Sequence, residues 1–522
     1  MAPTIVRSPY PDLTIPEASL PALVLAEAGR RAGKPALVDG PSGRTITYGE
    51  LAGGARLVAG GLAARGFGRG DVLAIHCPNL PEYALAFYGV LLAGGVNTTV
   101  NPLYTVDELA YQLDDAGASH LLTIPQFAGK GVEAAGRSGV QEVFVLGEAE
   151  GATPFAELLR AGAQPPRLDV DPAADLACLP YSSGTTGLPK GVMLTHRNLV
   201  ANLCQGQQVL TTGEDDVVAA VLPFFHIYGQ SVLMAAALWQ GATLVTMPRF
   251  DLEQFLTVLR DHRVTRAFVV PPIVLALAKH PLVDRFDLSA LRLVVSGAAP
   301  LGADLEEACA KRLGCLVGQG YGLTESSPVL TAHPADEARV RHGSAGQLLP
   351  NTEAKVVAVD GGEELGRNQT GELCFRGPQV MRGYLNRPEE TAQMLRPDGW
   401  LHTGDVGYVD DDGYVFIVDR VKELIKYKGL QVAPAELEAV LVAHPLVADA
   451  AVVGSPDEEA GEVPKAFVVA DAGLSAEEVT GYVAARVAPY KRVRAVEFVE
   501  EIPKAPSGKI LRRVLSRRDR QG

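Results

Sequence analysis

The 522-residue chain has little cysteine and fewer basic than acidic residues, and each shortage excludes some classes of protein. Its six cysteines are scattered without a C-x-x-C pair, so neither a disulfide framework nor a zinc site is indicated. Buried free thiols in a reducing cytosol are the expectation. The formal net charge of −14 argues against general nucleic-acid binding, because counterion release requires a basic surface. A local basic patch, which a solvated helix face explains, lies in the tail at Arg512, Arg513, Arg517, Arg518 and Arg520.

Targeting and membrane segments are also missing. The N-terminus has no basic stretch followed by an apolar core, and the C-terminal Arg-Gln-Gly is not the peroxisomal tripeptide, so a cytoplasmic protein is expected. Residues 217–248 contain no Asp, Glu, Lys or Arg and are long enough to span a bilayer. Pro223, His226 and Gly229 interrupt them, and a buried strand, turn, helix and strand fit better. We therefore predict no membrane insertion.

Length and pattern predict several structural units. A chain of this length is too long for one core, and 47% apolar residues are ample for buried sheets. Strand-length apolar runs at 72–76 and 120–123 flank a helical pattern at 81–92 and a capping box, Thr105 to Glu108, that opens a helix toward Ala116. The same alternation of strand-length apolar runs and helical patterns recurs over residues 217–317. It predicts right-handed βαβ units and parallel sheets covered on both faces.

The sequence pattern changes in the second half of the chain. Residues 354–414 carry short strands with Gly, Asp and Asn turns, which predicts a small, partly antiparallel β-subdomain. After residue 420 a compact unit follows, with helices expected at 434–441 and 475–487 and strands at 449–453 and 466–469. About a hundred residues are enough for a separate α+β lid domain. The expected fold class is thus an α/β N-terminal domain of parallel sheets with a β-subdomain, followed by that lid.

The segment Tyr181–Gly191, which reads YSSGTTGLPKG, is the most informative stretch. Glycine lets backbone N–H groups converge, hydroxyls can donate to phosphate oxygens or hold a metal, and lysine adds a charge. The spacing is G-x-x-G-x-x-K, so the loop is not a Walker A motif. A flexible Ser/Thr/Gly linker would explain its first half but not the LPKGV that follows. The stretch predicts a loop that grips a polyphosphate.

This loop and three motifs that follow it in order resemble the adenylate-forming superfamily: acyl- and aryl-CoA ligases, peptide-synthetase adenylation domains and beetle luciferases. The other motifs are GQGYGLTE at 318–325, WLHTGD at 400–405 and PSGK at 506–509. The resemblance covers essentially the whole chain. It implies a split into an N-terminal domain at 1–419 and a mobile lid at 420–522, with the hinge at or next to Lys422.

The resemblance implies that ATP and Mg²⁺ are used to cap a carboxylic acid with AMP, which turns a poor electrophile into one with a good leaving group. Glu325 and Thr185 would bind magnesium, a hard cation that takes oxygen ligands. Asp405 and Arg420 would contact the ribose hydroxyls. The other residues implied for the nucleotide are Ser182, Ser183, Gly184, Thr185, Thr186, Lys190, Gln319, Gly320 and Thr324.

Two faces of the lid would serve two half-reactions. Lys509 would bridge the substrate carboxylate and the α-phosphate as charge develops during adenylation. Residues 422–431, which read KELIKYKGLQ, resemble the segment that replaces it for thioester formation. Lys426 and Gln431 would then approach the acyl-adenylate. Lys428 and Gly429 would flank the channel for coenzyme A, and Lys422 would lie near the substrate. This implies a hinge motion between half-reactions.

The acid pocket resembles that of the 4-coumarate–CoA ligase group, through PFFHIY at 223–228 and SGAAPLG at 296–302. In that group the histidine, here His226, orders the site and gates thiol entry, and Arg249 falls where a basic residue serves CoA. Val232 stands where the plant group has a serine for the ring hydroxyl, with Ser231 one residue earlier, so plain cinnamate rivals 4-coumarate. Substrate contacts are expected from Tyr228, Ser231, Ala298, Gly320, Pro328, Val329 and Lys422.

The leading hypothesis is a CoA ligase for an aryl-propenoic acid, with a small carboxylic acid as its partner and no nucleic acid. A medium- or long-chain fatty acyl-CoA ligase is the first alternative. Only thirteen residues follow Lys509, which predicts no attached carrier-protein module. A stand-alone adenylation enzyme that loads a separate carrier protein stays open. A nucleotide-binding module without catalysis is disfavoured by the intact Glu325 and Lys509. The Ala-, Gly- and Arg-rich background predicts a bacterial source.

Overall fold

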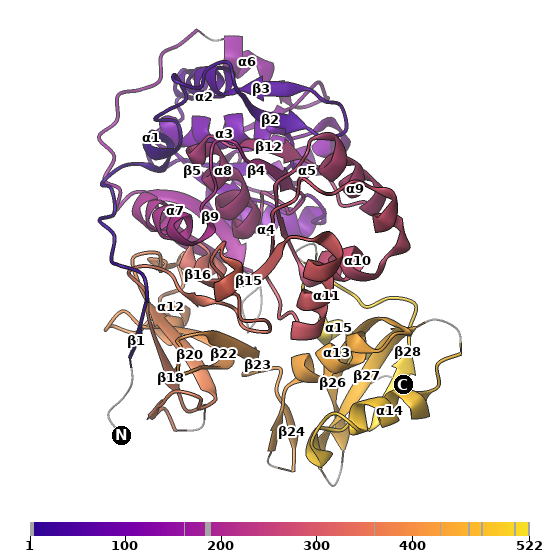
Figure 1. Cartoon of the computed structure of the whole chain (residues 1–522). Coiled ribbons are helices and arrows are strands. Elements are labelled where there is room, and N and C mark those ends of the chain that lie inside the picture. The colour runs from indigo at the N-terminus through magenta and orange to yellow at the C-terminus, as the bar shows by residue number, and fades with distance from the viewer. Residues whose placement is uncertain are drawn as a thin grey trace.

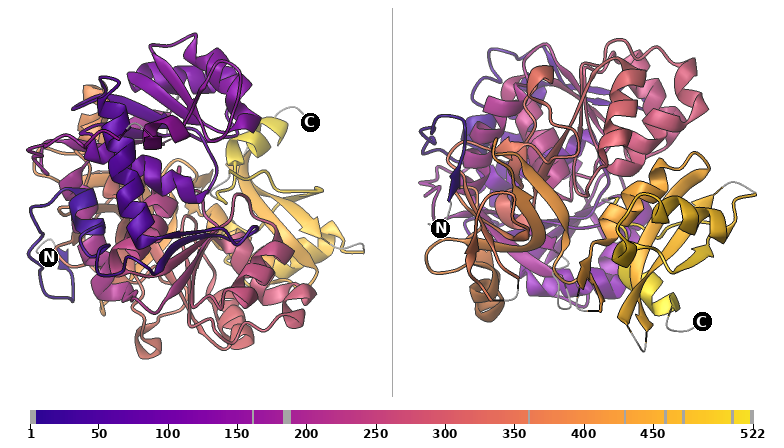
Figure 2. Two further views of the ribbon diagram at one scale, coloured as in Figure 1. Left: turned by 90° about the horizontal axis from the view of Figure 1, so that it is seen from above. Right: turned by 60° about the horizontal axis from the view of Figure 1, so that its bottom comes forward.

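The computed structural model describes residues 5–160, 162–182, 189–359, 361–428, 430–457, 460–470, 473–505 and 508–519. Within these ranges the chain forms a large α/β region, a β-subdomain below it and a C-terminal lid beside that (Figure 1). Seen from other sides, the lid lies against one flank of the larger body (Figure 2). The expected fold class is confirmed.

The first sheet of the α/β region has eight strands in the described residues, in the order β21-β10-β9-β5-β4-β6-β7-β8. Its central strands pair in parallel, whereas β9, β10 and β21 pair antiparallel at one edge. All four residues of β4 are buried, as a sheet covered on both faces requires. The bounds are β4 Val72–Ile75, β5 Val96–Thr99, β6 Ala118–Thr123, β7 Glu142–Val145, β8 Thr153–Pro154, β9 Leu176–Ser182, β10 Lys190–Thr195 and β21 Gly383–Tyr384.

The second sheet has nine strands in the described part, in the order β17-β16-β15-β14-β13-β11-β12-β2-β3. Strands β2 and β11 to β15 run parallel. Strand β3 pairs antiparallel with β2 at one end, and β16 and β17 are added by antiparallel pairing at the other. The bounds are β2 Pro35–Asp39, β3 Thr45–Thr47, β11 Val217–Ala220, β12 Thr243–Thr246, β13 Arg266–Val269, β14 Leu293–Ser296, β15 Leu316–Gly322, β16 Val329–Ala332 and β17 Gln347–Leu348.

Helices lie between and outside these sheets. Helix α3 contacts β4 and β5 of the first sheet and β2 of the second, so it fills the layer between them. Its first residue is Pro81, whose fixed φ suits a helix start. The bounds are α1 Leu20–Val24, α2 Tyr48–Ala63, α3 Pro81–Leu92, α4 Val106–Asp115, α5 Ala128–Ala135, α6 Ala156–Arg160, α7 His196–Leu210, α8 Ala236–Gln240, α9 Leu252–Asp261, α10 Pro271–Lys279 and α11 Ala303–Leu313.

The β-subdomain is an antiparallel sheet in the order β1-β18-β20-β22-β23, with β19 on β18. It confirms the antiparallel β-subdomain expected from residue 354 onward. The strands are β1 Val6–Arg7, β18 Glu353–Val357, β19 Glu364–Leu365, β20 Gly371–Arg376, β22 Leu401–Val409 and β23 Val415–Arg420, and helix α12 spans Pro388–Met394.

The lid has its own sheet, β25-β24-β27-β26 with β28 on β27, and its own apolar core. The expected two helices and two strands are present. A short hairpin precedes them and a helix follows the Lys509 segment. The bounds are β24 Ile425–Tyr427, β25 Leu430–Val432, α13 Pro434–Ala443, β26 Val447–Asp457, β27 Gly461–Ala470, α14 Ala476–Ala484, β28 Ala495–Phe498 and α15 Arg512–Asp519.

The charge-free stretch at 217–248 folds as predicted into strand, turn, helix and strand. Its helical part begins as a π-helix, Tyr228–Ala235, which continues into α8. Wide π turns are rare and concentrate at functional sites. No helix among the described residues is long and apolar enough to cross a membrane.

Candidate active site

The two strands that enclose the predicted phosphate loop form a hairpin at the edge of the first sheet. Ser182, at the end of β9, pairs with Lys190, at the start of β10. Ser183, Gly184, Thr185 and Thr186, which were predicted to hold the phosphates, lie outside the described residues. The hairpin therefore brings Ser182 and Lys190 together at the base of that loop.

Glu325 lies beside this base and is held in place. It sits in a short 3₁₀ turn, Thr324–Ser326, and is only 4% exposed. Its Oε1 accepts hydrogen bonds from the hydroxyl groups of Ser182, at 2.9 Å, and Tyr384, at 2.8 Å. The Lys190 ammonium lies 5.2 Å from the centre of the Tyr384 ring. The result is a fixed carboxylate with hydroxyl oxygens around it, which is the ligand type that Mg²⁺ prefers.

Asp405 and Arg420 face each other on neighbouring strands β22 and β23. Arg420 Nε lies 3.0 Å from Asp405 Oδ1, and the Tyr321 hydroxyl donates to Oδ2 at 2.7 Å. Burial raises the pKa of the Asp405 carboxyl, and the positive charges of Arg420 and Lys509 oppose that rise. One carboxylate oxygen is thus oriented by Arg420 of the predicted nucleotide site and the other by Tyr321 of the 318–325 motif.

The expected acid pocket centres on Tyr228, the first residue of the π-helix. Its hydroxyl donates to the Val295 carbonyl at 3.3 Å, and its ring covers Gly297, where a Cβ would come within 2.9 Å of Tyr228 Cε1. Ser231 is buried one turn further along. Ala298 is exposed and left-handed, with φ of 70°, so the structure places Gly297 rather than Ala298 against the tyrosine.

Pro328 and Val329 lie at the other side of this region, opposite the end of β15. A Cβ on Gly322 would approach the Pro328 carbonyl oxygen to 1.9 Å, so only glycine permits this close contact. The side chain of Asn202 bonds both backbone groups of Val329, donating to its carbonyl at 2.7 Å and accepting from its N–H at 3.0 Å. Gly320 lies in β15, and a Cβ there would lie 3.3 Å from the Thr331 carbonyl oxygen.

Gln319 has a supporting position. Its amide accepts from the Leu301 N–H and donates to the Leu301 carbonyl, both at 3.1 Å, and donates to Glu306 Oε2 at 2.8 Å. The side chain therefore fastens the loop that follows β14, on which Gly297 and Ala298 lie. Its predicted nucleotide contact stays a prediction.

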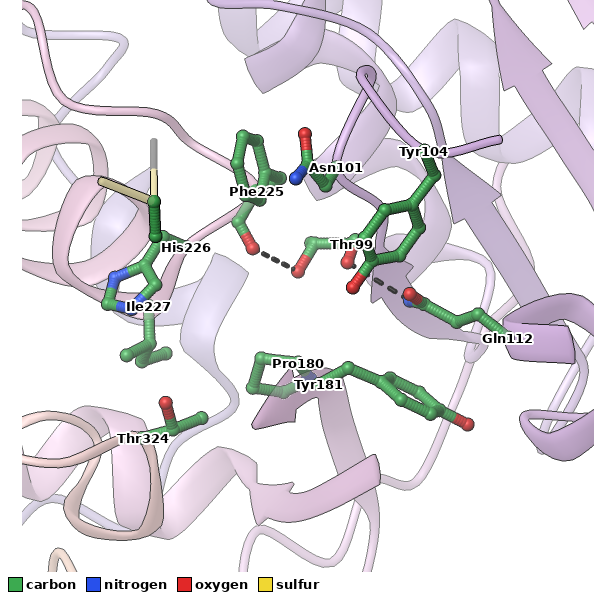
Figure 3. Close-up of a pocket in the computed structure, with 11 residues that line it drawn as sticks. Thr99, Asn101, Tyr104, Gln112, Pro180, Tyr181, Phe225, His226, Ile227 and Thr324 are labelled. Atoms are coloured by element: carbon green, nitrogen blue, oxygen red, sulfur yellow. Dashed lines mark hydrogen bonds between the residues drawn. The ribbon is translucent and has the colours of Figure 1, made fainter. Parts of the chain in front are cut away.

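His226 lines a cavity of about 120 Å³ together with Thr324 and Ala505 of the lid (Figure 3). Its Nδ1 accepts from the Tyr228 N–H at 3.3 Å. Burial lowers the pKa of the imidazole to about 4, so the ring is neutral at physiological pH. On the far wall the Thr99 hydroxyl donates to the Phe225 carbonyl at 2.7 Å.

Lys509 is turned into the site in this structure. Burial lowers the pKa of its ammonium, as does the charge of Arg420, and the carboxylates of Glu423 and Asp405 oppose them. The preceding Gly508 has φ of 80°, and a Cβ there would meet Val270 Cγ2 of the N-terminal region at 2.8 Å. The Lys509 segment is thus packed against the larger body beside the Asp405–Arg420 pair.

The second predicted face of the lid lies elsewhere. Lys426 and Gln431 are exposed and directly opposite each other on the β24–β25 hairpin. Lys428 is exposed with φ of 48°, and Gly429 lies outside the described residues. Lys422, the expected hinge, is exposed two residues after β23 ends. The predicted hairpin residues that the structure describes are therefore exposed to solvent, whereas the charge of Lys509 acts on Asp405.

Arg249 follows β12 and is exposed, next to Phe250, which is 44% exposed.

Two supporting residues escaped sequence reasoning. Tyr384 bonds Glu325 from 59 positions away, and Glu306 bonds Gln319 from the start of α11. Neither lies in a glycine-rich or hydroxyl-rich motif, so no local signal marks them.

The comparisons with known proteins agree with this architecture. The family described as "AMP-binding enzyme" matches residues 25–385, and "AMP-binding enzyme C-terminal domain" matches residues 436–509. A curated relative is 4-coumarate–CoA ligase 5 of Oryza sativa subsp. japonica, 47% identical over 98% of this chain and 96% of that protein. Among curated proteins, 4-coumarate–CoA ligase 1 of Solanum tuberosum is 46% identical, with the same coverage of both chains.

A solved structure shares the whole fold. Anthranilate CoA ligase AuaEII, in complex with anthranoyl-AMP, has a TM-score of 0.89 at 27% identity and covers 97% of this chain and 98% of its own. The chain belongs to the AMP-binding enzyme family, the adenylate-forming enzymes that the four motifs indicated. It is an AMP-forming acid–CoA ligase that uses ATP.

Proposed function

We propose that the protein joins an aryl-propenoic acid, 4-coumarate or cinnamate, to coenzyme A through an acyl-AMP intermediate. The identity of 43–47% to curated 4-coumarate–CoA ligases over nearly the full length carries this proposal. The Tyr228 ring over Gly297 supports it, because a flat slot beside an aromatic ring suits an aryl acid. Ser231, buried in the same helix, is the hydroxyl nearest in sequence to the position where the plant group has its serine.

The chemistry proceeds in two balanced steps. In the first, a carboxylate oxygen attacks the α-phosphorus of ATP and pyrophosphate leaves, which forms acyl-AMP. In the second, the sulfur of CoA attacks the acyl carbon, AMP leaves and the thiol proton is lost. Lys509 serves the first step as a cation next to the developing charge, since such transfers depend mainly on positioning and electrostatics. Lys426 and Gln431 approach the acyl-adenylate in the second, with Lys428 and Gly429 at the CoA channel and Arg249 on a CoA phosphate.

The oxygen donors around Glu325 fit a magnesium ion. Glu325 supplies the carboxylate and Ser182 a neighbouring hydroxyl, and bound Mg²⁺ would neutralise phosphate charge there. Thr185 is the further ligand that the motif implies, and Thr324 would contact the α-phosphate. Asp405 and Arg420 are proposed to contact the ribose, because Asp405 is already oriented by Tyr321. A cytosolic location is supported by the six cysteines, all of which are unbridged.

Acid-dependent pyrophosphate release tests the proposal. Cinnamate, 4-coumarate, ferulate, sinapate, benzoate and a fatty acid series are compared by kcat/KM, with thioester formation measured in parallel. The aryl-propenoates are expected to lead, and a fatty acid turning over far faster than cinnamate would refute the assignment. Comparing 4-coumarate with cinnamate then shows whether Ser231 replaces the missing serine at 232. Release without thioester would favour an enzyme that loads a separate carrier protein.

A further inference from the structure

Asp419 makes a contact that crosses the expected hinge. It lies in β23, in register with Val406 of β22, and so belongs to the sheet of the β-subdomain. Its carboxylate is buried, and Oδ2 accepts from the backbone N–H of Ala435 at 2.9 Å. Ala435 is the second residue of lid helix α13. A residue on one side of Lys422 therefore bonds a helix on the other side.

The contact replaces a local cap. The N-cap position of α13 is Ala433, which has no side-chain acceptor, so the first N–H groups of the helix depend on other partners. Asp419 supplies one acceptor to Ala435, and its second oxygen, Oδ1, accepts from the Arg420 N–H at 2.7 Å. The negative charge also lies at the positive end of the helix, which favours the contact further.

Apolar side chains surround this bond and also span the boundary. Val406 of β22 packs with Leu424 and Ala433 of the lid in one buried cluster. Arg512, three residues after Lys509, bonds Glu423 beside the hinge and donates to Glu438 of α13 at 2.6 Å. Helix α13 is therefore connected at its start to Asp419 and at its middle, through Glu438, to Arg512 of the segment that follows Lys509.

We propose that Asp419 is a positioning residue that latches the lid in the orientation that brings Lys509 to the Asp405–Arg420 pair. Any rotation of the lid about Lys422 moves α13 away from β23 and breaks the bond to Ala435. Asp419 thus favours the adenylation step at the expense of the orientation that presents the β24–β25 hairpin. The inference rests on the proposed two-step function, and it adds a residue that contacts neither ATP nor the acid.

The orientation can be measured without activity. A Cβ on Gly302 would lie 3.3 Å from the Cβ of Ala439 in α13, close to the separation found in disulfides. In the double variant Gly302→Cys/Ala439→Cys, the rate of disulfide formation under mild oxidant reports how often the lid occupies this orientation. Gly302→Cys alone is the control for reactions with the native thiols.

Asp419→Ala, added to the double variant, removes the acceptor and is expected to slow disulfide formation about fivefold, the size expected for loss of a helix cap. In the native background it should lower adenylation by a similar factor, and it should leave the conversion of supplied acyl-adenylate and CoA to thioester undiminished. Asp411→Ala, at an exposed aspartate in the β-subdomain, is the matched control and should change neither.

A purely structural cap makes a different prediction. Ala433→Ser would give α13 an acceptor of its own within the lid, so it should restore the melting temperature of Asp419→Ala. The latch predicts that adenylation and the disulfide rate stay low in that double variant. Recovery of both, or an equal fall of both half-reactions in Asp419→Ala, would overturn the proposal. If no acid supports pyrophosphate release, the proposed function fails, and the disulfide rate still tests the latch.

Discussion

The contact between Tyr228 and Gly297 makes a sharp prediction about substrate acceptance. In Gly297→Ala the new Cβ would lie 2.9 Å from Cε1, 3.1 Å from Cζ and 3.2 Å from the hydroxyl oxygen of Tyr228. Favourable carbon contacts begin at about 3.5 Å, so the ring must shift by roughly half an ångström. The ring is restrained by its bond to the Val295 carbonyl. Such overpacking costs about 1–3 kcal/mol.

A shift of the ring changes the slot in which we propose the aryl acid binds. We expect Gly297→Ala to lower kcat/KM for cinnamate and 4-coumarate by about 10–200-fold, the range that one methyl group commands in an apolar pocket. The fall should appear in acid-dependent pyrophosphate release. KM for ATP should stay near the wild-type value, because Asp405 and Glu325 are untouched.

The neighbouring residue supplies the matched control. Ala298 has φ of 70°, a region where glycine is unstrained, and its side chain is exposed. Ala298→Gly should therefore fold normally and leave kcat/KM for cinnamate and 4-coumarate barely changed. Unchanged cinnamate kinetics in Gly297→Ala would refute the reasoning, since the acid would then bind away from Tyr228.

Three further outcomes test the lid and the buried groups. In Lys509→Ala the rate of thioester synthesis from acid and ATP should fall by several decades, whereas the conversion of supplied acyl-adenylate should continue. Lys428→Ala should show the reverse, with normal adenylation and slow thioester formation. Equal losses of both half-reactions in both variants would contradict two separate lid faces. Because burial lowers the pKa of His226 to about 4, the rate of thioester formation from supplied acyl-adenylate should show no limb near pH 6.5, which a pH–rate profile checks. Burial raises the pKa of Glu438 to about 7, above its unfolded value, so its contribution to stability is full below about pH 4.5 and is lost as the pH rises to 7. The Tm of the wild type should therefore fall relative to that of Glu438→Gln across this pH window. A Tm difference that stays constant with pH would exclude the effect.

Local sequence predicted the elements well, because their signals are local. The helix at 81–92 has the expected bounds, and the capping box of Thr105 and Glu108 forms with both reciprocal bonds. The lid helix at 434–441 extends two residues further, to Ala443, and the strand at 449–453 is longer at both ends, because β26 pairs with β27 along its whole length. The π-helix at Tyr228 was not foreseen, since its wide turns leave no periodicity distinct from an α-helix.

The residues of the candidate site were likewise predictable where their signal is local in sequence. Ser182, Glu325, Asp405 and Lys509 stand in motifs whose composition indicates phosphate, metal and charge chemistry, and the structure brings Ser182 to Glu325 and the charge of Lys509 to Asp405. Their partners carry weaker signals. Tyr384 lies outside every motif, and Tyr321 lies within GQGYGLTE but had no role assigned to it. The hydroxyl groups that orient Glu325 and Asp405 acquire their role only when distant strands meet.

Asp419 shows why such residues escape motif-based reasoning. In sequence it is an aspartate at the end of an apolar strand, beside an arginine that the motif had already assigned. Its role depends on what another element lacks, since Ala433 leaves the start of α13 without a local cap. An acceptor in the lid itself would have stabilised the helix equally well in either orientation. An acceptor placed across the hinge stabilises only one, so the position of the cap, more than its strength, can couple the stability of a small helix to the choice between two half-reactions.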